Sequence, residues 1–443
     1  MHTQDNYIDL YELADQYYAK GLLEKSEELI IATLKENPGF APAFQLLAQI
    51  TEDLGFADDA LVFHRFRASK YISLPERLRK KYFKYYVNRT NKTGPVSVNY
   101  EKTRFFDGES TDLGLVSPSL KVHTKYFKKT ALGSDPAYLY SIPGGSAWID
   151  GFNQVVWDSA GNIIPQLCRG HVELIDSIVS KRDPVQLQSR VGVIANRNNG
   201  NYYHWLTDVA PALSLFSSAG FSPELMDYYI SNPIITDFQR EVLDIYNIPT
   251  SKQILHDEQT YIQADELIIA TWGSNTMGVN VGSWVSEEFK HRFQCESSDN
   301  SGDSEPRLYI SRGNSETRRI LNEPELTELL TNRYGFKVVD TLDYSVKEQA
   351  RLFANAQCIL AAHGAALTNI HFCTPGTSVI EIFGNYVDPC FWVLCNRIGL
   401  NHHFHQPDLY QSAPKCPKGI GERRKMDIAV DITELDRQLR LWL

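Results

Sequence analysis

The stretch CILAAHGAALTN, residues 358–369, decides the fold of the C-terminal half of the chain. Its first five residues are apolar and predict a short buried strand, and the glycine after His363 predicts a tight turn into a helix. Similar apolar runs occur at 308–310, 336–339 and 378–383, separated by helical patterns that start near Asn322, Ser345 and Gly364. This alternation predicts a parallel sheet covered by helices, and hence a doubly wound lobe.

A less regular version of the same pattern lies upstream. Apolar runs at 191–195, 228–230 and 267–270 alternate with helical segments near Tyr203 and at 238–246. We therefore expect an α/β protein with two Rossmann-like lobes, at 144–296 and 297–443, bridged by a helix near 281–293. A ligand is expected between the lobes, at the carboxyl ends of the strands.

A repeat with a period of 34 residues lies near the N-terminus, where Leu13-Ala14, Gly21 and Ser26 are matched by Leu47-Ala48, Gly55 and Ala60. The period resembles that of the tetratricopeptide repeat, in which small residues lie where two helices cross. We expect two such units at 7–72 in a helical domain at 1–73, followed by a connector at 74–143. Two repeats bury little surface alone, so we expect contact with the remaining chain, a protein partner or a second copy. Two amphipathic helix pairs without a ligand are the alternative.

The composition excludes several classes of protein. A net charge of −10 over 443 residues disfavours a large interface with nucleic acid. The seven cysteines include no CxxC pair and predict free thiols rather than a disulfide framework or a zinc site. The N-terminus lacks the pattern of a signal peptide, and no segment has the roughly 18 apolar residues of a transmembrane helix. We therefore expect a cytoplasmic protein, peripheral at most at the inner face of the membrane.

Candidate binding residues lie at two predicted strand ends of the C-terminal lobe. The turn at His363 and Gly364 brings backbone amides and a helix N-terminus to one place, which predicts a cradle for a diphosphate. Glu381 ends an apolar strand, where its carboxylate is suited to accept the hydroxyls of a ribose, with a structural ion pair as the alternative. Arg312, together with Arg318 and Arg319, offers guanidinium groups to a leaving diphosphate, with a solvated basic loop as the alternative.

Candidate catalytic residues begin a helix of the N-terminal lobe. His204 and Asp208 are four residues apart and share one helix face. Either side chain is able to take a proton, and we expect Asp208 to be the base for an acceptor hydroxyl while His204 orients the acceptor or shares the proton. A helix-capping pair is the alternative. Toward the C-terminus, the run His402-His403-Phe404-His405 also contains titratable side chains. Only His403 and His405 would point to one face of a strand, so metal binding there is not expected.

These blocks together resemble glycosyltransferase family 61. The resemblance rests on HWLTD at 204–208, on YISR at 309–312 with Arg319 and Asn322-Glu323, and on HGA at 363–365 through Glu381, and it covers roughly residues 140–410. It implies a GT-B type fold and an inverting transfer from a nucleotide-sugar such as a UDP-sugar. The expected donor-binding residues are Arg312, Arg318, Arg319, His363, Gly364, Ala365, Thr368, Asn369 and Glu381.

The sequence also departs from this family. We expect it to have no secretory anchor of the kind found in eukaryotic members, and its tetratricopeptide-like front is not part of the family core. No Asp-X-Asp triplet occurs, so we expect no metal and no other cofactor, with arginines and helix ends neutralising the donor.

From the family resemblance and the expected cytoplasmic location, we expect the acceptor to be a glycan, a lipid-linked glycan or a protein. Synthesis of a bacterial surface polysaccharide is the favoured role. Two alternatives stay open. One is a non-catalytic tetratricopeptide adaptor with a degenerate transferase domain. The other is a nucleotide-sugar epimerase or dehydrogenase, although the GxGxxG motif of such an enzyme is missing.

Overall fold

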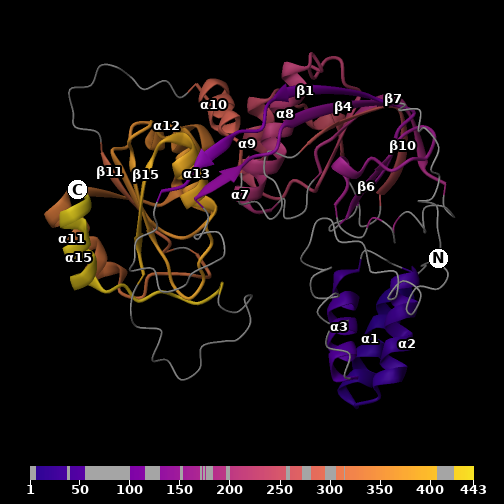
Figure 1. Cartoon of the computed structure of the whole chain (residues 1–443), viewed down its shortest axis with the longest axis horizontal. Helices are drawn as coiled ribbons and strands as arrows, with labels where there is room; N and C mark the ends of the chain where they lie inside the picture. Colours follow the sequence, from indigo (N-terminus) through magenta and orange to yellow (C-terminus); the bar gives the residue numbers. More distant parts are fainter. Residues whose placement is uncertain are drawn as a thin grey trace.

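A computed structural model describes residues 6–36, 40–54, 100–114, 130–149, 153–169, 172, 175, 183–195, 200–255, 260–271, 281–294, 306–313, 315–406 and 424–443. The described chain contains a group of N-terminal helices and two large sheets, each flanked by helices (Figure 1). We call the eight-stranded sheet with its helices the first lobe, and the five-stranded sheet with its helices the second lobe. The expected α/β class is thus confirmed. Among the described helices, none is long and apolar enough to cross a membrane.

The N-terminal helices are α1 (Asn6–Ala19), α2 (Leu23–Glu36) and α3 (Ala41–Asp53), which have an apolar core of their own. Gly21 takes a φ of 71° in the turn between α1 and α2, a conformation that glycine adopts without strain. Ser26 is fully buried and donates a hydrogen bond of 2.7 Å to the carbonyl of Ala14, so the two helices cross closely there. Gly55 and Ala60 lie outside the described residues, and the tetratricopeptide repeat therefore stays a prediction.

The sheet of the first lobe has a parallel centre and antiparallel additions. Its parallel strands are β7 (Val185–Val193), β8 (Tyr228–Ser231), β9 (Gln253–Leu255) and β10 (Thr260–Ala270). Its antiparallel strands are β1 (Glu101–Phe106), β4 (Ala137–Pro143), β5 (Ser146–Ile149) and β6 (Gln154–Trp157). The expected sheet was mostly parallel. Two of the antiparallel strands, β1 and β4, come from the segment expected to be a connector, and the other two, β5 and β6, precede the first parallel strand within the expected lobe. β1, with the sequence EKTRFF, is largely exposed and so lacks the apolar pattern of a buried strand.

Helices flank this sheet on the path toward the second lobe. They are α7 (Tyr202–His204), a π-helical turn (Trp205–Val209), α8 (Ala210–Ser218) and α9 (Asp237–Ile245), followed by the expected bridging helix α10 (Ser283–Arg292). The N–H of Ala210 donates to the carbonyl of Trp205, five residues back, which is the hydrogen bond of a π-helical turn. The next residue, Pro211, has no N–H to donate near the start of α8. The π turn buries Trp205 and Asp208.

The second lobe contains the parallel sheet that the sequence predicted. The spatial order of its strands is β12 (Phe336–Val339), β11 (Arg307–Ile310), β13 (Cys358–Ala362), β14 (Ser378–Ile382) and β15 (Asn401–His405). One face carries α12 (Val346–Ala354), α13 (Cys390–Ile398) and the 3₁₀ helix η6 (Ala365–Phe372). The other face carries α11 (Glu323–Tyr334) and α15 (Ile432–Trp442). Both faces are therefore covered, as in doubly wound folds.

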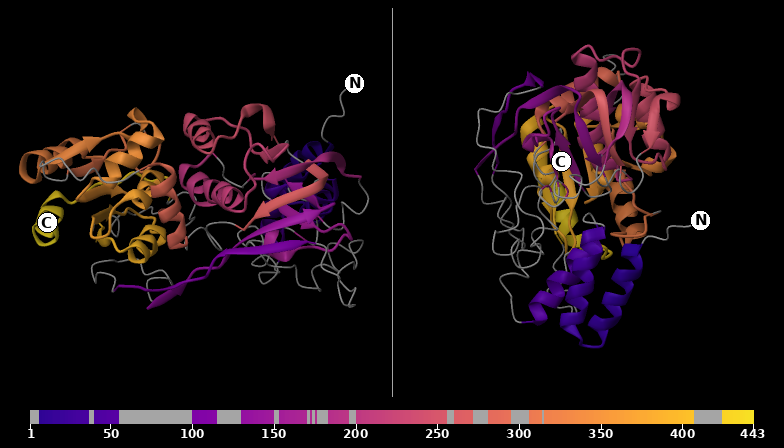
Figure 2. Two further views of the ribbon diagram at one scale, coloured as in Figure 1. Left: turned by 90° about the horizontal axis from the view of Figure 1, so that it is seen from above. Right: turned by 90° about the vertical axis from the view of Figure 1, so that its right-hand side faces the viewer.

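The two lobes share an apolar core. One cluster of buried side chains includes Trp205 and Leu213 from the first lobe, Phe289 from α10, and Phe372 and Leu394 from the second lobe. Side views show the two sheets next to each other, with α10 between them (Figure 2). Burial of this surface away from water favours one relative placement of the lobes.

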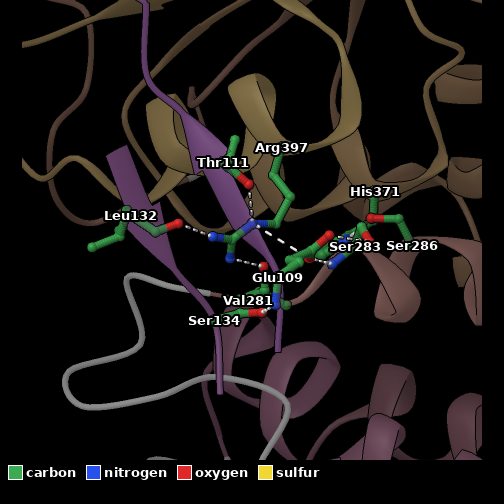
Figure 3. A network of polar contacts seen from close by, with 9 residues as sticks. All are labelled: Glu109, Thr111, Leu132, Ser134, Val281, Ser283, Ser286, His371 and Arg397. Carbon is green, nitrogen blue, oxygen red and sulfur yellow. Dashed lines mark hydrogen bonds and ion pairs between the residues drawn. The ribbon is translucent and has the colours of Figure 1, made fainter. Parts of the chain in front are cut away.

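A buried arginine adds a polar link to this core. Arg397 lies near the end of α13, and its side chain is 0% exposed. A short two-stranded arm, β2 (Ser110–Asp112) with β3 (Ala131–Gly133), reaches α13 from the chain that precedes β4 (Figure 3). Arg397 donates to Thr111 Oγ1 at 2.9 Å, to the carbonyl of Leu132 at 2.8 Å and to the carbonyl of Val281 at 2.7 Å. One side chain thus joins the arm, the start of the bridge and the second lobe.

We expect Arg397→Met to lower the free energy of unfolding by about 3 kcal/mol, because buried acceptors would lose a charged donor. Urea unfolding followed by tryptophan fluorescence measures the change. Arg437→Met is the matched control, since Arg437 is 64% exposed and pairs only with Glu434 among the described residues. That control should change stability by less than about 1 kcal/mol. Equal stability of the two variants would contradict the structural role of Arg397.

Candidate functional site

The strand order of the second lobe marks a position for a ligand. When the strands are numbered by their order in the chain, they lie side by side as 2-1-3-4-5. The chain therefore continues from β11 toward one edge of the sheet and from β13 toward the opposite edge. Ligands bind in doubly wound folds at the carboxyl ends of the two strands where this reversal occurs. Arg312 follows β11, and His363 with Gly364 follows β13. The predicted residues therefore lie at this switch point.

Gly364 allows a close approach between these two strand ends. A Cβ atom on this residue would lie only 1.9 Å from Nη1 of Arg312, so the guanidinium group rests against the glycine backbone. The φ of Gly364 is 176°, an extended conformation open to any residue. Glycine is thus needed here for space and not for its backbone freedom.

Three arginines with few acidic partners gather beside this turn. Burial, followed by the charge of Arg318, lowers the pKa of Arg312 to about 10. Arg424 donates to the Tyr386 hydroxyl at 2.8 Å, and its charge helps to lower the pKa of Arg318, for which burial is the main cause. The Nε atoms of Arg312 and Arg318 are buried without a hydrogen-bond partner among the described residues. Partly buried, mutually repelling cations of this kind favour binding of an anion.

The backbone at Arg318 supports the same conclusion. Its φ of 57° is in the left-handed region, which a non-glycine residue occupies at a cost of about 1 kcal/mol or more. The adjacent Arg319 turns away, because its guanidinium group binds Asp427 Oδ2 at 2.7 and 3.1 Å. The turn thus directs two neighbouring arginines to different surroundings.

A fully buried carboxylate lies next to the same turn. Glu381 Oε1 contacts His363 Nδ1 at 2.5 Å, and Oε2 contacts His402 Nε2 at 2.9 Å. Burial alone would raise the pKa of Glu381, but the charge and hydrogen bond of His363, together with the hydrogen bond of His402, outweigh it and hold the pKa below its usual value. Both oxygens are engaged inside the protein, so Glu381 does not present the carboxylate that the sequence suggested for a ribose.

The two residues of the first lobe that the sequence suggested as a catalytic pair lie in contact. His204 Nδ1 contacts Asp208 Oδ2 at 3.2 Å, and Arg169 lies 3.8 Å from the other carboxylate oxygen. The side chain of Asp208 is 3% exposed, whereas that of His204 is 27% exposed. Within this pair, His204 is the group that solvent and ligands reach.

Aromatic rings join the two groups of residues across the lobes. Tyr203, beside His204, packs edge-on against Phe391 of α13 with ring centroids 5.6 Å apart. Phe391 in turn lies 5.5 Å from the ring of His363. The helix that carries the candidate base and the turn that carries the candidate anion site are therefore neighbours.

Comparison with known protein families identifies the part of the chain that contains these residues. Residues 202–380 match the model of the family described as Glycosyltransferase 61. These residues form a glycosyltransferase 61 domain. The segment begins at α7 and includes His204, Asp208, Arg312, Arg318 and His363.

Curated relatives match over short segments. Over 98 residues the chain is 32% identical to the beta-1,2-xylosyltransferase of Arabidopsis thaliana, a match that covers 19% of this chain and 18% of that protein. It is 34% identical over 84 residues to the human protein O-linked-mannose beta-1,4-N-acetylglucosaminyltransferase 2, covering 18% of this chain and 14% of that protein. With the mouse EGF domain-specific O-linked N-acetylglucosamine transferase the identity is 29% over 105 residues, covering 23% and 20%. The chain spans a fifth or less of the length of these relatives.

Other predicted residues of the glycosyltransferase 61 domain have mainly internal contacts. Thr368 donates to the carbonyl of Ala365 at 2.6 Å within η6. Asn369 is fully buried, donates to Gln349 at 2.8 Å and accepts from the Tyr202 hydroxyl at 2.7 Å. Asn369 thus links the two lobes, and donor contacts by these residues stay a prediction.

The three histidines at 402, 403 and 405 each contact a different residue. His403 stacks on Trp442 at 4.9 Å, and His405 Nδ1 lies 2.8 Å from Gln438 Oε1, while His402 binds Glu381. Within the described ranges, no three His, Cys, Asp or Glu side chains gather in a way that could hold a metal ion.

Sequence reasoning missed His402, Tyr386, Arg424 and Phe391. The sequence indicated His402 only as part of a histidine run, because its pairing with Val379, which puts it on the same sheet face as Glu381, is set by the register of the sheet. Arg424 follows a long segment without a clear pattern, and nothing local placed it beside Tyr386.

We expect Gly364→Ala to weaken binding of inorganic pyrophosphate at least about tenfold, because the new methyl group would displace the Arg312 guanidinium group from the turn. Calorimetric titration measures the affinity, and the melting temperature should change little because the displaced atom ends a flexible side chain. Gly313→Ala is the control: its Cβ would meet its nearest neighbours at 3.5 Å, an ordinary contact. Unchanged affinity in Gly364→Ala would remove the anion site from this turn.

Proposed function

We propose that this protein is an inverting glycosyltransferase that moves a sugar from a nucleotide-sugar donor to a hydroxyl acceptor. The observation that carries the proposal is the opposition of two unlike sites. A partly buried arginine cluster lies at the switch point of the second lobe, and a His–Asp pair lies at the facing helix of the first lobe. The family match over residues 202–380 supports the same reaction class.

The two lobes are proposed to act as in GT-B type enzymes, with donor and acceptor bound on opposite sides. In the first lobe, the four parallel strands lie side by side in the order β9, β8, β7, β10. The strand order reverses between β7 and β10, so α7, which follows β7, also lies at a switch point. An inverting transfer is a single displacement and needs a base on the acceptor side and charge stabilisation on the donor side. The His–Asp pair and the arginine cluster provide these two functions.

The roles within the pair follow from exposure. We expected Asp208 to be the base, but its 3% exposure favours His204 as the group that contacts the acceptor. His204 then takes the hydroxyl proton, while Asp208 holds Nδ1 and stabilises the positive charge that forms. The acceptor oxygen attacks the anomeric carbon, and the bond from that carbon to the donor phosphate breaks with its electrons passing to the diphosphate.

The donor is proposed to be a UDP-sugar and the acceptor a glycan or protein hydroxyl. The names of the relatives describe transfer of xylose and of N-acetylglucosamine; one name specifies O-linked mannose and another O-linked N-acetylglucosamine. Those relatives are plant and animal proteins, and the expected role in a bacterial surface polysaccharide stays a prediction.

A screen of donors tests the function directly. The intact chain is incubated with UDP-, GDP-, dTDP- and CMP-sugars, and melting temperature and release of free nucleotide are measured. A bound donor at about 100 times its Kd adds roughly 2.7 kcal/mol of stability, so the correct nucleotide should stand out. Stabilisation by no donor, together with no nucleotide release, would argue against a glycosyltransferase.

Asp208→Asn and His204→Ala should each lower kcat by about 10²- to 10⁴-fold while donor affinity stays near that of the wild type. Asp237→Asn is the control, since Asp237 is 92% exposed and pairs with Arg240. Nucleotide release under saturating donor measures the rate. Activity retained in His204→Ala but lost in Asp208→Asn would make Asp208 the base, and normal turnover in both would place the acceptor site elsewhere.

We also propose that transfer needs no divalent metal. The proposal rests on the partly buried Arg312 and Arg318, which provide positive charge where the diphosphate would bind. Rates measured with EDTA should equal rates measured with added Mn²⁺ or Mg²⁺. Loss of transfer in EDTA that is restored by Mn²⁺ would contradict metal independence.

A further inference from the structure

The Glu381 carboxylate lies between two histidines that cannot have the same role. His402 Nδ1 is buried and has no hydrogen-bond partner among the described residues, and Phe404 packs against the ring at 4.5 Å. A doubly protonated His402 would therefore bury an unpaired N–H, which is costly. His402 is most stable as the neutral ring whose Nε2–H donates to Glu381 Oε2.

The second oxygen of Glu381 then determines the orientation of His363. With Oε2 held by His402, Oε1 accepts from Nδ1–H of His363. The His363 ring is also confined by Phe383, Tyr386 and Phe391, whose centroids lie 5.4 to 5.6 Å away. Nε2 of His363 makes no hydrogen bond within the described part of the chain, and its side chain retains 8% exposure.

The surroundings of His363 indicate what this nitrogen meets. Gly364 follows it directly and lies against the Arg312 guanidinium group. Phe391 on the other side packs against Tyr203 of the first lobe. His363 thus lies between the proposed donor phosphates and the proposed acceptor helix, where the bond to the leaving group breaks.

We propose that His402 is a positioning residue, which acts through Glu381 to direct Nε2 of His363 at the leaving diphosphate; the inference rests on the proposed glycosyl transfer. When the bond from the anomeric carbon to the phosphate oxygen breaks, the electron pair passes to that oxygen. His363, protonated on both nitrogens beside ionised Glu381, donates a hydrogen bond from Nε2 to this oxygen and keeps its proton. The acceptor proton goes to His204, so the step needs no other reactant.

A purely structural role for His402 predicts a different pattern of effects. If the histidine only fills space and satisfies a buried carboxylate, its loss lowers stability and leaves the rate per folded molecule unchanged. If it positions His363, its loss lowers kcat with little change in donor KM, because the hydrogen bond strengthens in the transition state.

Three variants on one strand separate these cases. His402→Gln keeps an N–H donor at the position of Nε2, and His402→Leu removes it. His403→Leu is the control, because His403 lies next in β15 and packs on Trp442 at the opposite face of the sheet. We expect His402→Leu to lower kcat by about 10- to 100-fold with donor KM within about threefold, and His402→Gln to recover most of the rate. His403→Leu should retain wild-type kcat.

A spectroscopic measurement tests the orientation without relying on activity. Nitrogen-15 histidine labelling shows by NMR which ring nitrogen carries the proton, and His363→Asn identifies the signals of His363. Wild type and His402→Gln should show a protonated, hydrogen-bonded Nδ1 in His363, and His402→Leu should lose it.

Retention of that signal or of wild-type kcat in His402→Leu would overturn the proposal, as would equal loss of kcat in the Gln and Leu variants. If the wild type transfers no sugar from any donor, the proposed function fails, and the NMR comparison still decides whether His402 orients His363.

Discussion

Contact between the two lobes is the constraint on which the candidate site depends. The candidate base lies on the first lobe and the arginine cluster of the candidate anion site on the second, so their separation is set by the shared apolar core and by Arg397. α13 couples these features directly. Arg397 near its end holds the arm and the bridge, while Phe391 near its start touches both Tyr203 and His363. A helix about two turns long therefore connects the structural clamp with the reacting groups.

Charge is arranged unequally on the two sides of this contact. Exposed arginines such as Arg319 and Arg437 have carboxylate partners, whereas Arg312 and Arg318 bury their Nε atoms without a hydrogen bond among the described residues. Burying cations in this way costs stability unless an anion completes the site. The left-handed backbone at Arg318 adds to that cost, and strain of this kind is common at binding sites.

Buried carboxylates recur beside both candidate reacting histidines. Asp208 contacts Nδ1 of His204, and Glu381 contacts Nδ1 of His363, and among the described residues neither Nε2 atom has a hydrogen-bond partner. The same hydrogen bond fixes the ring and selects the tautomer. The two sides of the proposed reaction thus use one local arrangement for different tasks, proton removal at His204 and stabilisation of the leaving group at His363.

The sequence alone determined the elements that depend on local pattern. Alternating apolar runs and helical segments predicted four of the five strands of the second lobe, the bridging helix and the turn at Gly364, because periodicity and turn chemistry act over a few neighbouring residues. Tertiary structure decided which side chains meet. It placed Glu381 between two histidines, paired Arg319 with Asp427, added the exposed strand β1 to the first sheet and brought Arg424 to Tyr386. These contacts join residues 18 to 108 positions apart, as with His363 to Glu381 and Arg319 to Asp427, and only the packing of the whole chain brings such positions together.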